Sequence, residues 1–581
     1  MRTNGEAQMT RLDGGELLAR TLAKAGVREV FALHGGHLES FLQGCVHNNI
    51  RLTDTRHEAA AGHAADGYAR ATGEIGVCTV TAGPGFANVV PAIVNAYLDG
   101  VPTLFLIGAP PLREAETNPL QGGFDQVAMI APVSKWAHRV THAERIPDLT
   151  AQAIRIARNG RPGPVVLELP IDVLHGPVDP KAVVLPTGID VRTHPAPSPE
   201  EANALIEFLR KAQRPIIFAG GGSRFANAAK ELRRFVELSG VPVFVNPRGY
   251  GLLPPEHRLF GKDVSNLAAL TMMGGEGPDA VLILGARLGL FAGGRGGKII
   301  PANARIAQVD IDAGEIGRLM SPEVAAAADV TETLRALNEH GARVKWPDWS
   351  QWATKAVSMK QAHAMLFGGT DAQSPMHPYA AAREIMKALG RDMIYVLDGG
   401  EAGAWAQMHV DVDEPGRVLG HGYLGCLGIG PGMAIGAQRA FPNKRVVLVT
   451  GDGAVGFHIQ EFDTMVRHGL PVLTIIFNNR AWGMSIHGQE AMYGRNAHVI
   501  TELADTNYHT VAQAFGCHGA RIDRLEDVGP AVKRALASGT PACLNIIVDR
   551  EAVHPITTML MGEKEDKKTV IPYYENITAA Q

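Results

Sequence analysis

The stretch RVVLVTGDGAVGFHIQEFDTM, residues 445–465, changes at Gly-Asp-Gly from an apolar, β-branched run to a helical pattern. A strand that ends in this way exposes backbone N–H groups at the start of a helix, where phosphate groups bind. The carboxylate of Asp452, between the two glycines, is a candidate ligand for a divalent cation. The stretch therefore predicts a site for a metal diphosphate, although Gly-Asp-Gly is also common in ordinary turns.

Length and composition indicate a protein of several α/β domains without a nucleic-acid partner. The chain has 581 residues, which is enough for about three to four domains of ordinary size. Hydrophobic residues make up 46% and charged residues 20%, and the net charge of -4 gives no electrostatic reason to expect a polyanion. These values favour a small-molecule substrate over nucleic acid.

Cysteine usage and the terminal residues bear on the compartment. The five cysteines show no CxxC pairing, so neither a disulfide framework nor a zinc site is expected. The N-terminal residues lack a signal-type apolar core, and no stretch has the uninterrupted apolar length of a membrane helix. We expect a cytoplasmic protein that does not enter a membrane.

Apolar runs alternate with helical patterns along the whole chain, which predicts parallel sheets covered on both faces by helices. Two polar, Pro-rich connectors, roughly residues 180–200 and 346–376, divide this pattern into three doubly wound domains. The boundaries predicted for the domains are 10–180, 198–345 and 376–553, followed by a C-terminal tail, 554–581. The first and third blocks resemble each other in the order of strands and helices.

The middle block has the strand, glycine turn and helix of a nucleotide-binding fold in RPIIFAGGGSRFANA, residues 214–228. It lacks the full GxGxxG spacing. Two alternatives stay open at this point: a nucleotide site, or a domain that only spaces the other two.

A second clue to the metal site lies downstream, where the strand LTIIF ends in Asn478-Asn479, about 24 residues after Gly-Asp-Gly. Adjacent strands of a parallel sheet end side by side, so Asp452 and the Asn479 side chain are expected to converge on one Mg²⁺. A main-chain carbonyl just beyond, at Ala481, and diphosphate oxygens complete the expected set of ligands.

This pair of motifs resembles the binding motif of thiamine diphosphate (ThDP)-dependent enzymes, and the resemblance covers nearly the whole chain. It implies a pyrimidine-binding domain, a middle domain and a diphosphate-binding domain in that order. It also implies that Gly453 and Ala454 bind the cofactor together with Asp452, Asn479 and Ala481. Subunits of such enzymes share their sites, so a homodimer or homotetramer is expected.

The resemblance implies a glutamate that bonds N1′ of the cofactor pyrimidine, and in TRHEAAAGHAADGYARATG the candidate is Glu58. A carboxyl group in that position promotes the imino tautomer needed for proton removal from the thiazolium. The alternative is that Glu58 only caps a helix dipole.

The resemblance implies three further cofactor contacts. In HGYLGCLGIGPGMAIGAQ, residues 421–438, Leu427 corresponds to the apolar wedge under the thiazolium, and the Gly425 carbonyl to the acceptor for the 4′-amino group. In LDGGEAGAW, residues 397–405, the backbone amides of Gly400 and Glu401 correspond to the diphosphate loop. Packing in the core is the alternative for Leu427.

Within the family the resemblance is to benzaldehyde lyase and the 2-hydroxyacyl-CoA lyases. It rests on FALHGGHLESF, DTRHEAAAGHAADGYARA, ETNPLQGGFDQVAMIAPVSKWAHRV, HGYLG and the stretch from GDG through NNRAWG. It implies that His37 and Gln121 face the thiazolium, where an imidazole and a carboxamide move protons and hold a developing alkoxide. His34 is equally at home in a turn at the strand end.

Two differences from benzaldehyde lyase point to another substrate. Gly403 stands where that enzyme has a tyrosine, and this is expected to free space near the cofactor. Glu490 stands in place of an amide, which makes it either a catalytic acid-base group or a solvated loop acid.

The tail after the last predicted strand suggests the substrate. It carries Tyr573, Tyr574 and three lysines, Lys564, Lys567 and Lys568, and it is interpreted as a lid over a phosphate-bearing substrate. A 2-hydroxyacyl-CoA split into formyl-CoA and an aldehyde or ketone is the resulting hypothesis, with ADP or the CoA nucleotide in the middle domain. Alternatives are a free 2-hydroxyketone lyase, acetolactate synthase, a flavin-dependent oxidase and a catalytically silent subunit.

Overall fold

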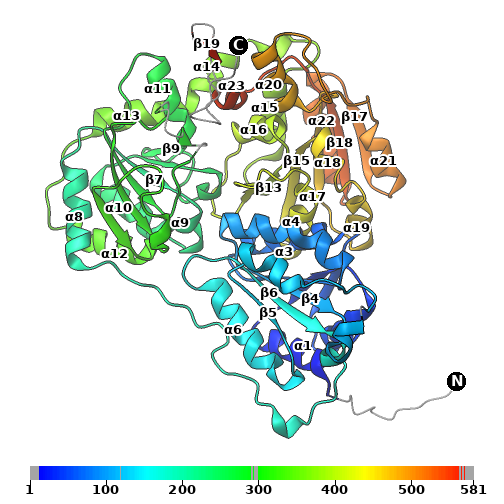
Figure 1. Ribbon diagram of the computed structural model, residues 1–581. Coiled ribbons are helices and arrows are strands. Elements are labelled where there is room, and N and C mark those ends of the chain that lie inside the picture. The colour runs from blue at the N-terminus through cyan, green and yellow to red at the C-terminus, as the bar shows by residue number, and fades with distance from the viewer. Residues whose placement is uncertain are drawn as a thin grey trace. The chain divides into compact units, whose positions relative to one another are not determined.

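The structure is a computed structural model that describes residues 12–117, 119–289, 292, 293, 297, 299–561, 564, 565, 568 and 569. The chain divides into two compact units, and each is described by itself (Figure 1). The first unit contains the described residues up to 69, together with 74–192 and 422–426. The second contains residues 70–73, 193–421 and the described residues from 427 onward.

The first unit is built on a sheet of six parallel strands in the order β2-β1-β3-β4-β6-β5. The strands are β1 Glu29–Ala32, β2 Arg51–Asp54, β3 Gly76–Val80, β4 Thr103–Ala109, β5 Trp136–Arg139 and β6 Pro164–Pro170. The helices are α1 Gly14–Lys24, α2 Glu39–His47, α3 Glu58–Thr72, α4 Pro84–Asp99, α5 Gln126–Ile130, α6 Ile146–Arg158 and α7 Ile171–Leu174. Every residue of β3, β4 and β6 is buried, as expected for parallel strands covered on both faces.

The middle part of the second unit has a second parallel sheet, in the order β12-β11-β10-β7-β8-β9. Its strands are β7 Pro215–Ala219, β8 Val243–Val245, β9 Phe260–Asp263, β10 Ala280–Leu284, β11 Arg305–Asp310 and β12 Val324–Ala327. The helices are α8 Pro199–Arg210, α9 Gly221–Phe225, α10 Ala229–Ser239, α11 Ala268–Met272, α12 Val330–Gly341, α13 Ser350–Ser358 and α14 Ala362–Phe367. Numbered within the sheet this order is 3-2-1-4-5-6, that of a dinucleotide-binding fold.

The C-terminal part of the second unit has a third parallel sheet, in the order β14-β13-β15-β16-β18-β17. Its strands are β13 Met393–Leu397, β14 Val418–Gly420, β15 Arg445–Gly451, β16 Leu473–Asn478, β17 His518–Ile522 and β18 Ala542–Ile547. The helices are α15 Pro378–Leu389, α16 Glu401–Gln407, α17 Gly430–Ala440, α18 Asp452–Val455, α19 Glu461–Arg467, α20 Gly483–Tyr493, α21 Tyr508–Ala514, α22 Leu525–Ala537 and α23 Pro555–Met561. A two-stranded ladder of β19 Lys564–Glu565 and β20 Lys568–Thr569 follows.

The first and third sheets have the same strand order, which in each reads 2-1-3-4-6-5 when the strands are numbered within the sheet. The predicted likeness of the first and third blocks is therefore confirmed, as is the α/β class with three parallel sheets. In this order the chain turns in opposite directions after the first and third strands of each sheet. Ligands of doubly wound folds bind outside the carboxyl ends of two such strands.

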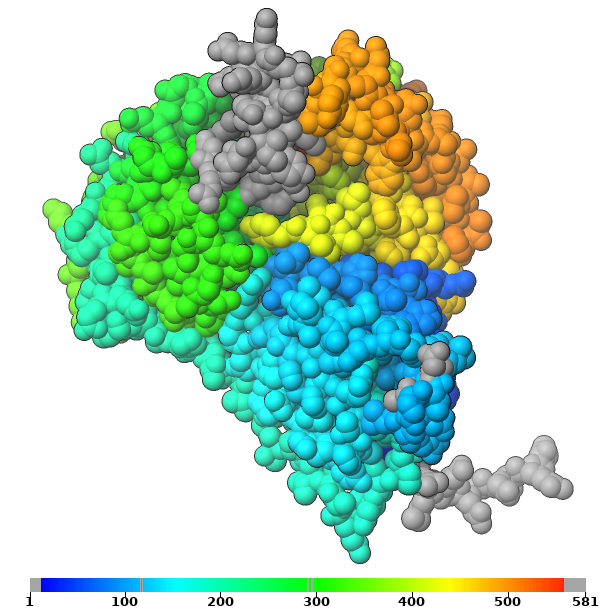
Figure 2. Space-filling view, in the orientation of Figure 1, coloured from blue at the N-terminus to red at the C-terminus, as the bar shows by residue number. Residues whose placement is uncertain are grey.

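The two connectors differ in structure. The first is largely exposed (Figure 2) and ends at Ser198, where a capping box with Glu201 starts α8. The second contains α13 and α14. Two of its three tryptophans, Trp349 and Trp352, are buried and donate their indole N–H groups to the carbonyls of Ala212 and Pro215. This connector is therefore packed against the middle sheet.

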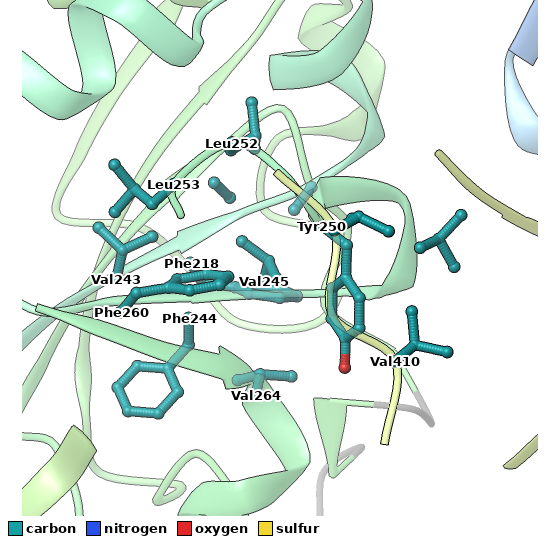
Figure 3. Packing of buried hydrophobic residues seen from close by; sticks show 14 of the residues in the cluster. Phe218, Val243, Phe244, Val245, Tyr250, Leu252, Leu253, Phe260, Val264 and Val410 are labelled. Carbon is teal, nitrogen blue, oxygen red and sulfur yellow. The ribbon is translucent and has the colours of Figure 1, made fainter. Parts of the chain in front are cut away.

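Aromatic and branched residues fill the core of the middle sheet (Figure 3). Phe218, Phe244 and Phe260 come from three neighbouring strands, and Tyr250 packs beside them. Val410, from the loop after α16, belongs to the same buried cluster, so the core continues into the C-terminal part of the second unit. Within the described part of the chain, no helix is long and apolar enough to cross a membrane.

Candidate active site

The third sheet brings two glycine-containing turns together at its carboxyl edge. Strand β13 is followed by Asp398-Gly399-Gly400, and the neighbouring β15 ends at Gly451, which precedes Asp452. Gly399 has φ +81°, and a Cβ atom there would lie 3.1 Å from the Gly451 nitrogen. Glycine is needed at 399 both for this backbone conformation and for this close approach.

Asp452 and Asn479 lie at the ends of adjacent parallel strands, as the sequence predicts. Asp452 Oδ2 accepts a hydrogen bond of 2.8 Å from the Arg480 backbone N–H, and Asn479 Oδ1 accepts one of 3.2 Å from Ala481 N–H. Gly453 N–H bonds to Asp452 Oδ1 at 3.0 Å. The two predicted metal-ligating side chains are therefore held by the same short segment, while ligation itself stays a prediction.

The carboxylate of Asp452 suits a cation. It is 3% exposed, and among the described residues no lysine, arginine or histidine forms an ion pair with it. Burial raises the pKa of Asp452 to about 7, despite backbone N–H groups that act in the opposite direction. A buried carboxylate without a partner cation is costly, and a bound Mg²⁺ with oxygen ligands offsets that cost. The residues present therefore fit the metal.

The expected diphosphate loop is at the start of α16. Gly400 is its N-terminal flanking residue, and Glu401 is the first helical residue, so their N–H groups lie among those that the helix itself leaves unpaired. Ala454 is buried in α18, directly after Gly453. These backbone groups lie at the same sheet edge as Asp452 and fit a diphosphate.

Asp398 is a fully buried carboxylate that the sequence did not single out. It accepts hydrogen bonds from the backbone N–H groups of Gly399, Gly428 and Gly430, at 2.6, 3.2 and 3.0 Å. It thereby fixes the chain immediately after the half-buried Leu427. Its position directly before Gly-Gly at a strand end is the signal that could have identified it.

Gly403 does not open space in the way expected from the sequence. It is buried in α16, and an added Cβ would lie 3.3 Å from the Asp398 carbonyl oxygen and 3.4 Å from the Asp398 nitrogen. The backbone of the loop already occupies that side, so the small residue serves close packing of the helix on the strand end.

In the first unit the corresponding edge holds His37. It follows β1, and its Nδ1 lies 3.0 Å from Oγ1 of Thr81, which follows β3. A Cβ on Gly35 would lie 2.3 Å from the Thr81 Cβ, so the first glycine of the sequence HGGH allows the two turns to meet. Burial, and secondarily His175, lower the pKa of His37. The imidazole is neutral at neutral pH, and none of the described residues forms a hydrogen bond with its Nε2.

Gln121 contacts the turn that follows β3, at Gly83. It has φ +63°, and its Cα and Cβ lie within 3.0 Å of the point where a Cβ on Gly83 would be. The buried Gln126, which the sequence did not single out, bonds Gly83 N–H at 2.9 Å and the Gly108 carbonyl at 3.1 Å. His37 and Gln121 therefore flank one turn, residues 81–83.

Glu58 is the first residue of α3 and is 8% exposed. Its Oε2 accepts a hydrogen bond of 2.9 Å from the Asn88 amide of α4. Gly425, also in the first unit, has φ +65° and is exposed. The predicted cofactor contacts of Glu58 and Gly425 are not tested by these positions and stay predictions.

Glu490 has a partner within its own part of the fold. Its Oε1 lies 2.7 Å from His498 Nε2, and both side chains are 22% exposed. On α20, at about 100° per residue, Glu490 is about 240° round the helix from Met484, which packs at Gly400. The hydrogen bond with His498 gives Glu490 a structural explanation, and its catalytic role stays a prediction.

The glycines of the middle sheet are explained by packing. A Cβ on Gly220 would lie 2.6 Å from the Ala286 Cβ, and one on Gly222 would lie 2.7 Å from the Gly285 Cα. The turns after β7 and β10 therefore contact each other through backbone atoms. These glycines are therefore explained without a nucleotide. Only the strand order of the sheet still supports the prediction of a nucleotide site.

Three family models match the chain, one over each sheet. They are described as thiamine pyrophosphate enzyme domains: N-terminal TPP binding at residues 12–129, central at 202–337, and C-terminal TPP binding at 398–546. The chain belongs to the thiamine pyrophosphate enzymes. Thiamine pyrophosphate is another name for ThDP, so the cofactor predicted from Asp452 and Asn479 is supported by the family as a whole.

Relatives that match nearly the whole chain carry the names of two different enzymes. The chain is 35% identical to acetolactate synthase large subunit IlvG of Mycobacterium tuberculosis, with 94% of this chain and 97% of the relative covered. It is 31% identical to 2-hydroxyacyl-CoA lyase 2 of Bos taurus, with 92% and 90% covered. A probable acetolactate synthase large subunit of Methanocaldococcus jannaschii is 29% identical, with 97% and 98% covered. The relatives support the family and leave the branch open.

The predicted tail begins as a packed helix. Thr557 of α23 is 1% exposed, and its hydroxyl donates to the Glu401 carboxylate. Tyr573, Tyr574 and Lys567 lie outside the described residues, as do the side chains of Lys564 and Lys568. Of the expected lid, residues 554–581, only 554–561, 564, 565, 568 and 569 are described.

Proposed function

We propose that this chain is a ThDP- and Mg²⁺-dependent carbon–carbon lyase that cleaves a 2-hydroxy carbonyl compound and catalyses the reverse carboligation. A 2-hydroxyacyl-CoA is the proposed substrate class, with formyl-CoA and an aldehyde or ketone as products. The observation that carries the proposal is the neutral, half-buried His37, with Nδ1 at Thr81 and Nε2 without a partner among the described residues.

The binding roles follow from the site. Asp452, Asn479 and the Ala481 carbonyl would hold Mg²⁺, and the backbone N–H groups of Gly400 and Glu401 would bind the diphosphate. Glu58 would bond the pyrimidine N1′. When bound, ThDP supplies a carbon nucleophile that adds to a carbonyl group and takes up the electrons of the broken bond.

His37 supplies the base that cleavage of a 2-hydroxy carbonyl compound requires. Cleavage beside a hydroxyl group requires removal of the hydroxyl proton, and a neutral imidazole is suited to accept it at neutral pH. In the tautomer in which Nδ1–H donates to Thr81 Oγ1, the Nε2 lone pair is the base. Decarboxylation of a 2-oxo acid expels CO₂ without such a base. The amide of Gln121, on the same turn, would hold the developing alkoxide.

Acetolactate synthase is the second candidate, because relatives at 35% and 29% identity carry that name over nearly their whole length. The thioester substrate is supported by the bovine relative's name. A free 2-hydroxyketone is the alternative within the lyase class.

A single panel separates these candidates. The purified chain with ThDP and Mg²⁺ is incubated in turn with a 2-hydroxyacyl-CoA, with formyl-CoA plus an aldehyde, with benzoin and with pyruvate, and products are followed by mass. Turnover of pyruvate alone would establish the synthase, and turnover of benzoin but of no CoA ester would establish the ketone lyase. A yellow protein would indicate a flavin, and thermal stabilisation by ThDP without any turnover would indicate a silent subunit.

A further inference from the structure

The side chain of Glu401 has contacts that diphosphate binding by its backbone does not explain. Its Oε1 lies 2.9 Å from His487 Nδ1 of α20 and 3.3 Å from the His554 backbone nitrogen. The hydroxyl of Thr557, in α23, donates to the same oxygen. The Glu401 and His487 side chains are only 6% and 3% exposed. A buried carboxylate thus joins the start of α16 to two elements far along the chain.

With Glu401 ionised, the geometry favours a charged His487. Its Nδ1 faces the Glu401 carboxylate at 2.9 Å, and its Nε2 faces the Arg550 carbonyl at 2.8 Å. Neither a carboxylate nor a carbonyl can donate, so both ring nitrogens must carry hydrogen. The ring is an imidazolium, and Glu401 and His487 form a buried ion pair. Although burial alone lowers the pKa of His487, the bonds to Glu401 outweigh it and raise the pKa above its ordinary value.

The Glu401–His487 pair lies next to both the predicted diphosphate loop and the predicted metal-binding turn. A Cβ on Gly483, at the start of α20, would lie 3.3 Å from Glu401 Oε2 and 2.9 Å from Asn479 Nδ2. Gly483 therefore lies between the Glu401 carboxylate and Asn479, a predicted metal ligand. The next residue, Met484, packs on Gly400, where an added Cβ would lie 3.3 Å from the Met484 Cβ.

We propose that Glu401 and His487 are positioning residues that hold the diphosphate loop and the metal-binding turn in register, and that α23 is part of this support. The inference rests on the proposed function, because it takes the backbone of residues 400 and 401 as the diphosphate loop. Neither side chain touches the reacting atoms.

The charge of His487 is what makes the arrangement compatible with an anionic ligand. A diphosphate bound at the Glu401 N–H groups would be repelled by an unpaired carboxylate on the same residue. His487 neutralises that carboxylate at a site where solvent screening is weak. Loss of His487 alone leaves a buried unpaired anion, whereas loss of both charges removes the repulsion.

A double-mutant cycle tests the proposal. Glu401→Gln, His487→Gln and the double variant are compared by the Kd of ThDP, measured calorimetrically with saturating Mg²⁺, and by the urea midpoint of each apo chain. We expect His487→Gln to weaken ThDP binding by about tenfold or more, and Glu401→Gln to weaken it less. The double variant should bind more tightly than His487→Gln alone, because no unpaired charge remains.

Thr557→Val tests the contribution of α23 without changing a charge, and it also serves where a charge variant does not fold. It should weaken ThDP binding by a few fold. For Glu401→Gln the matched control is Glu339→Gln, which removes an exposed ion pair with Arg343 elsewhere in the second unit.

The outcomes separate this inference from the proposed function. ThDP binding by the wild-type chain, and its loss in Asp452→Ala, test the cofactor site independently of the pair. Suppose that both of these results are obtained, but that the ThDP Kd is unchanged in the two single variants of the pair, the double variant and Thr557→Val. If only the urea midpoint of the apo chain then changes, Glu401 and His487 have a structural role only, and the proposal is overturned. If the wild-type chain does not bind ThDP, the proposed function fails and this inference fails with it.

Discussion

Asp452 Oδ2 accepts a hydrogen bond of 2.8 Å from the backbone N–H of Arg480, and this bond joins the turn after β15 to the turn after β16. Arg480 has φ +59°, a left-handed conformation that a non-glycine residue adopts only at a cost. The contact places a buried carboxylate beside the segment that carries Asn479 and Ala481. A small strained turn therefore holds the predicted Mg²⁺ ligands together.

Asp452→Asn should abolish metal-dependent cofactor binding while leaving the fold intact. Asparagine retains an oxygen that can accept from Arg480 N–H, but it removes the charge that attracts Mg²⁺. We expect the Kd of ThDP in the presence of Mg²⁺ to rise by about a hundredfold or more, because even loss of an outer contact costs up to about a hundredfold. Isothermal titration measures this, with Asp392→Asn, an exposed acid of the same unit, as the control. Unchanged ThDP binding would remove Asp452 from the metal site.

Glu58→Gln should keep the fold and lose turnover by about a hundredfold or more, because an amide cannot exchange a proton with N1′. Glutamine retains an acceptor for the Asn88 amide, so the melting temperature should stay near that of the wild type. Steady-state kinetics and thermal melting are measured on Glu58→Gln and on the exposed Glu114→Gln. Activity within about threefold of wild type would reject the cofactor role of Glu58.

The sequence predicts those parts of the site that consist of one short segment at a strand end. Gly-Asp-Gly and Asn-Asn could be paired because parallel strands end at the same edge of a sheet, and the structure places them so. The contact of Glu401 with Thr557 could not be predicted, because it joins residues 156 positions apart through a short helix at the start of a tail that is polar as a whole. Gln126 was missed for a similar reason: its partners Gly83 and Gly108 are brought together only by the sheet. The free space predicted beside Gly403 is not found there. That space is occupied by the backbone of Asp398, whose position cannot be predicted from the sequence.

Mixed subunits should recover activity if the sites are shared between chains, as the family resemblance implies. Glu58→Gln lies in the first unit and Asp452→Ala in the second, so a mixed dimer would contain one site with neither substitution. We expect each variant to be inactive alone and an equimolar mixture to regain about a quarter of wild-type activity. Random assortment makes half of the dimers mixed, and each mixed dimer has one intact site of two. Subunit exchange is checked by mass. No recovery after confirmed exchange would place each site within a single chain.

The segment around α23 should loosen as the pH falls, because His554 is buried in the neutral form. Burial lowers the pKa of His554 from 6.5 to about 3. Between these values the open state binds more protons than the closed state, so the free energy of opening falls with falling pH, by about 1.4 kcal/mol per pH unit. Hydrogen exchange of α23 amides at pH 6 and pH 5, corrected for intrinsic rates, measures this effect.

His554→Asn supplies the control for that experiment. Asparagine can accept from Ile556 N–H, as His554 Nδ1 does at 3.0 Å, but it has no charge to gain. The extra opening between pH 6 and pH 5 should therefore be absent in the variant. An equal pH effect in the two proteins would show that another group is responsible.

His37→Asn should test the base assigned to the cleavage step. The Asn amide can occupy the place of Nδ1 and keep a hydrogen bond to Thr81, while Nε2, the proposed base, is lost. A lyase should lose about a hundredfold or more in kcat for cleavage of its 2-hydroxy carbonyl substrate, with the ThDP Kd unchanged. The pH profile should change too, since the rise of kcat/KM with the ionisation of His37 would disappear. Gln121→Ala is the companion variant, because loss of an alkoxide donor should lower kcat without removing that ionisation. If His37→Asn cleaved the substrate at the wild-type rate, the base assigned to His37 would be wrong. If pyruvate alone were turned over, the synthase would take the place of the lyase.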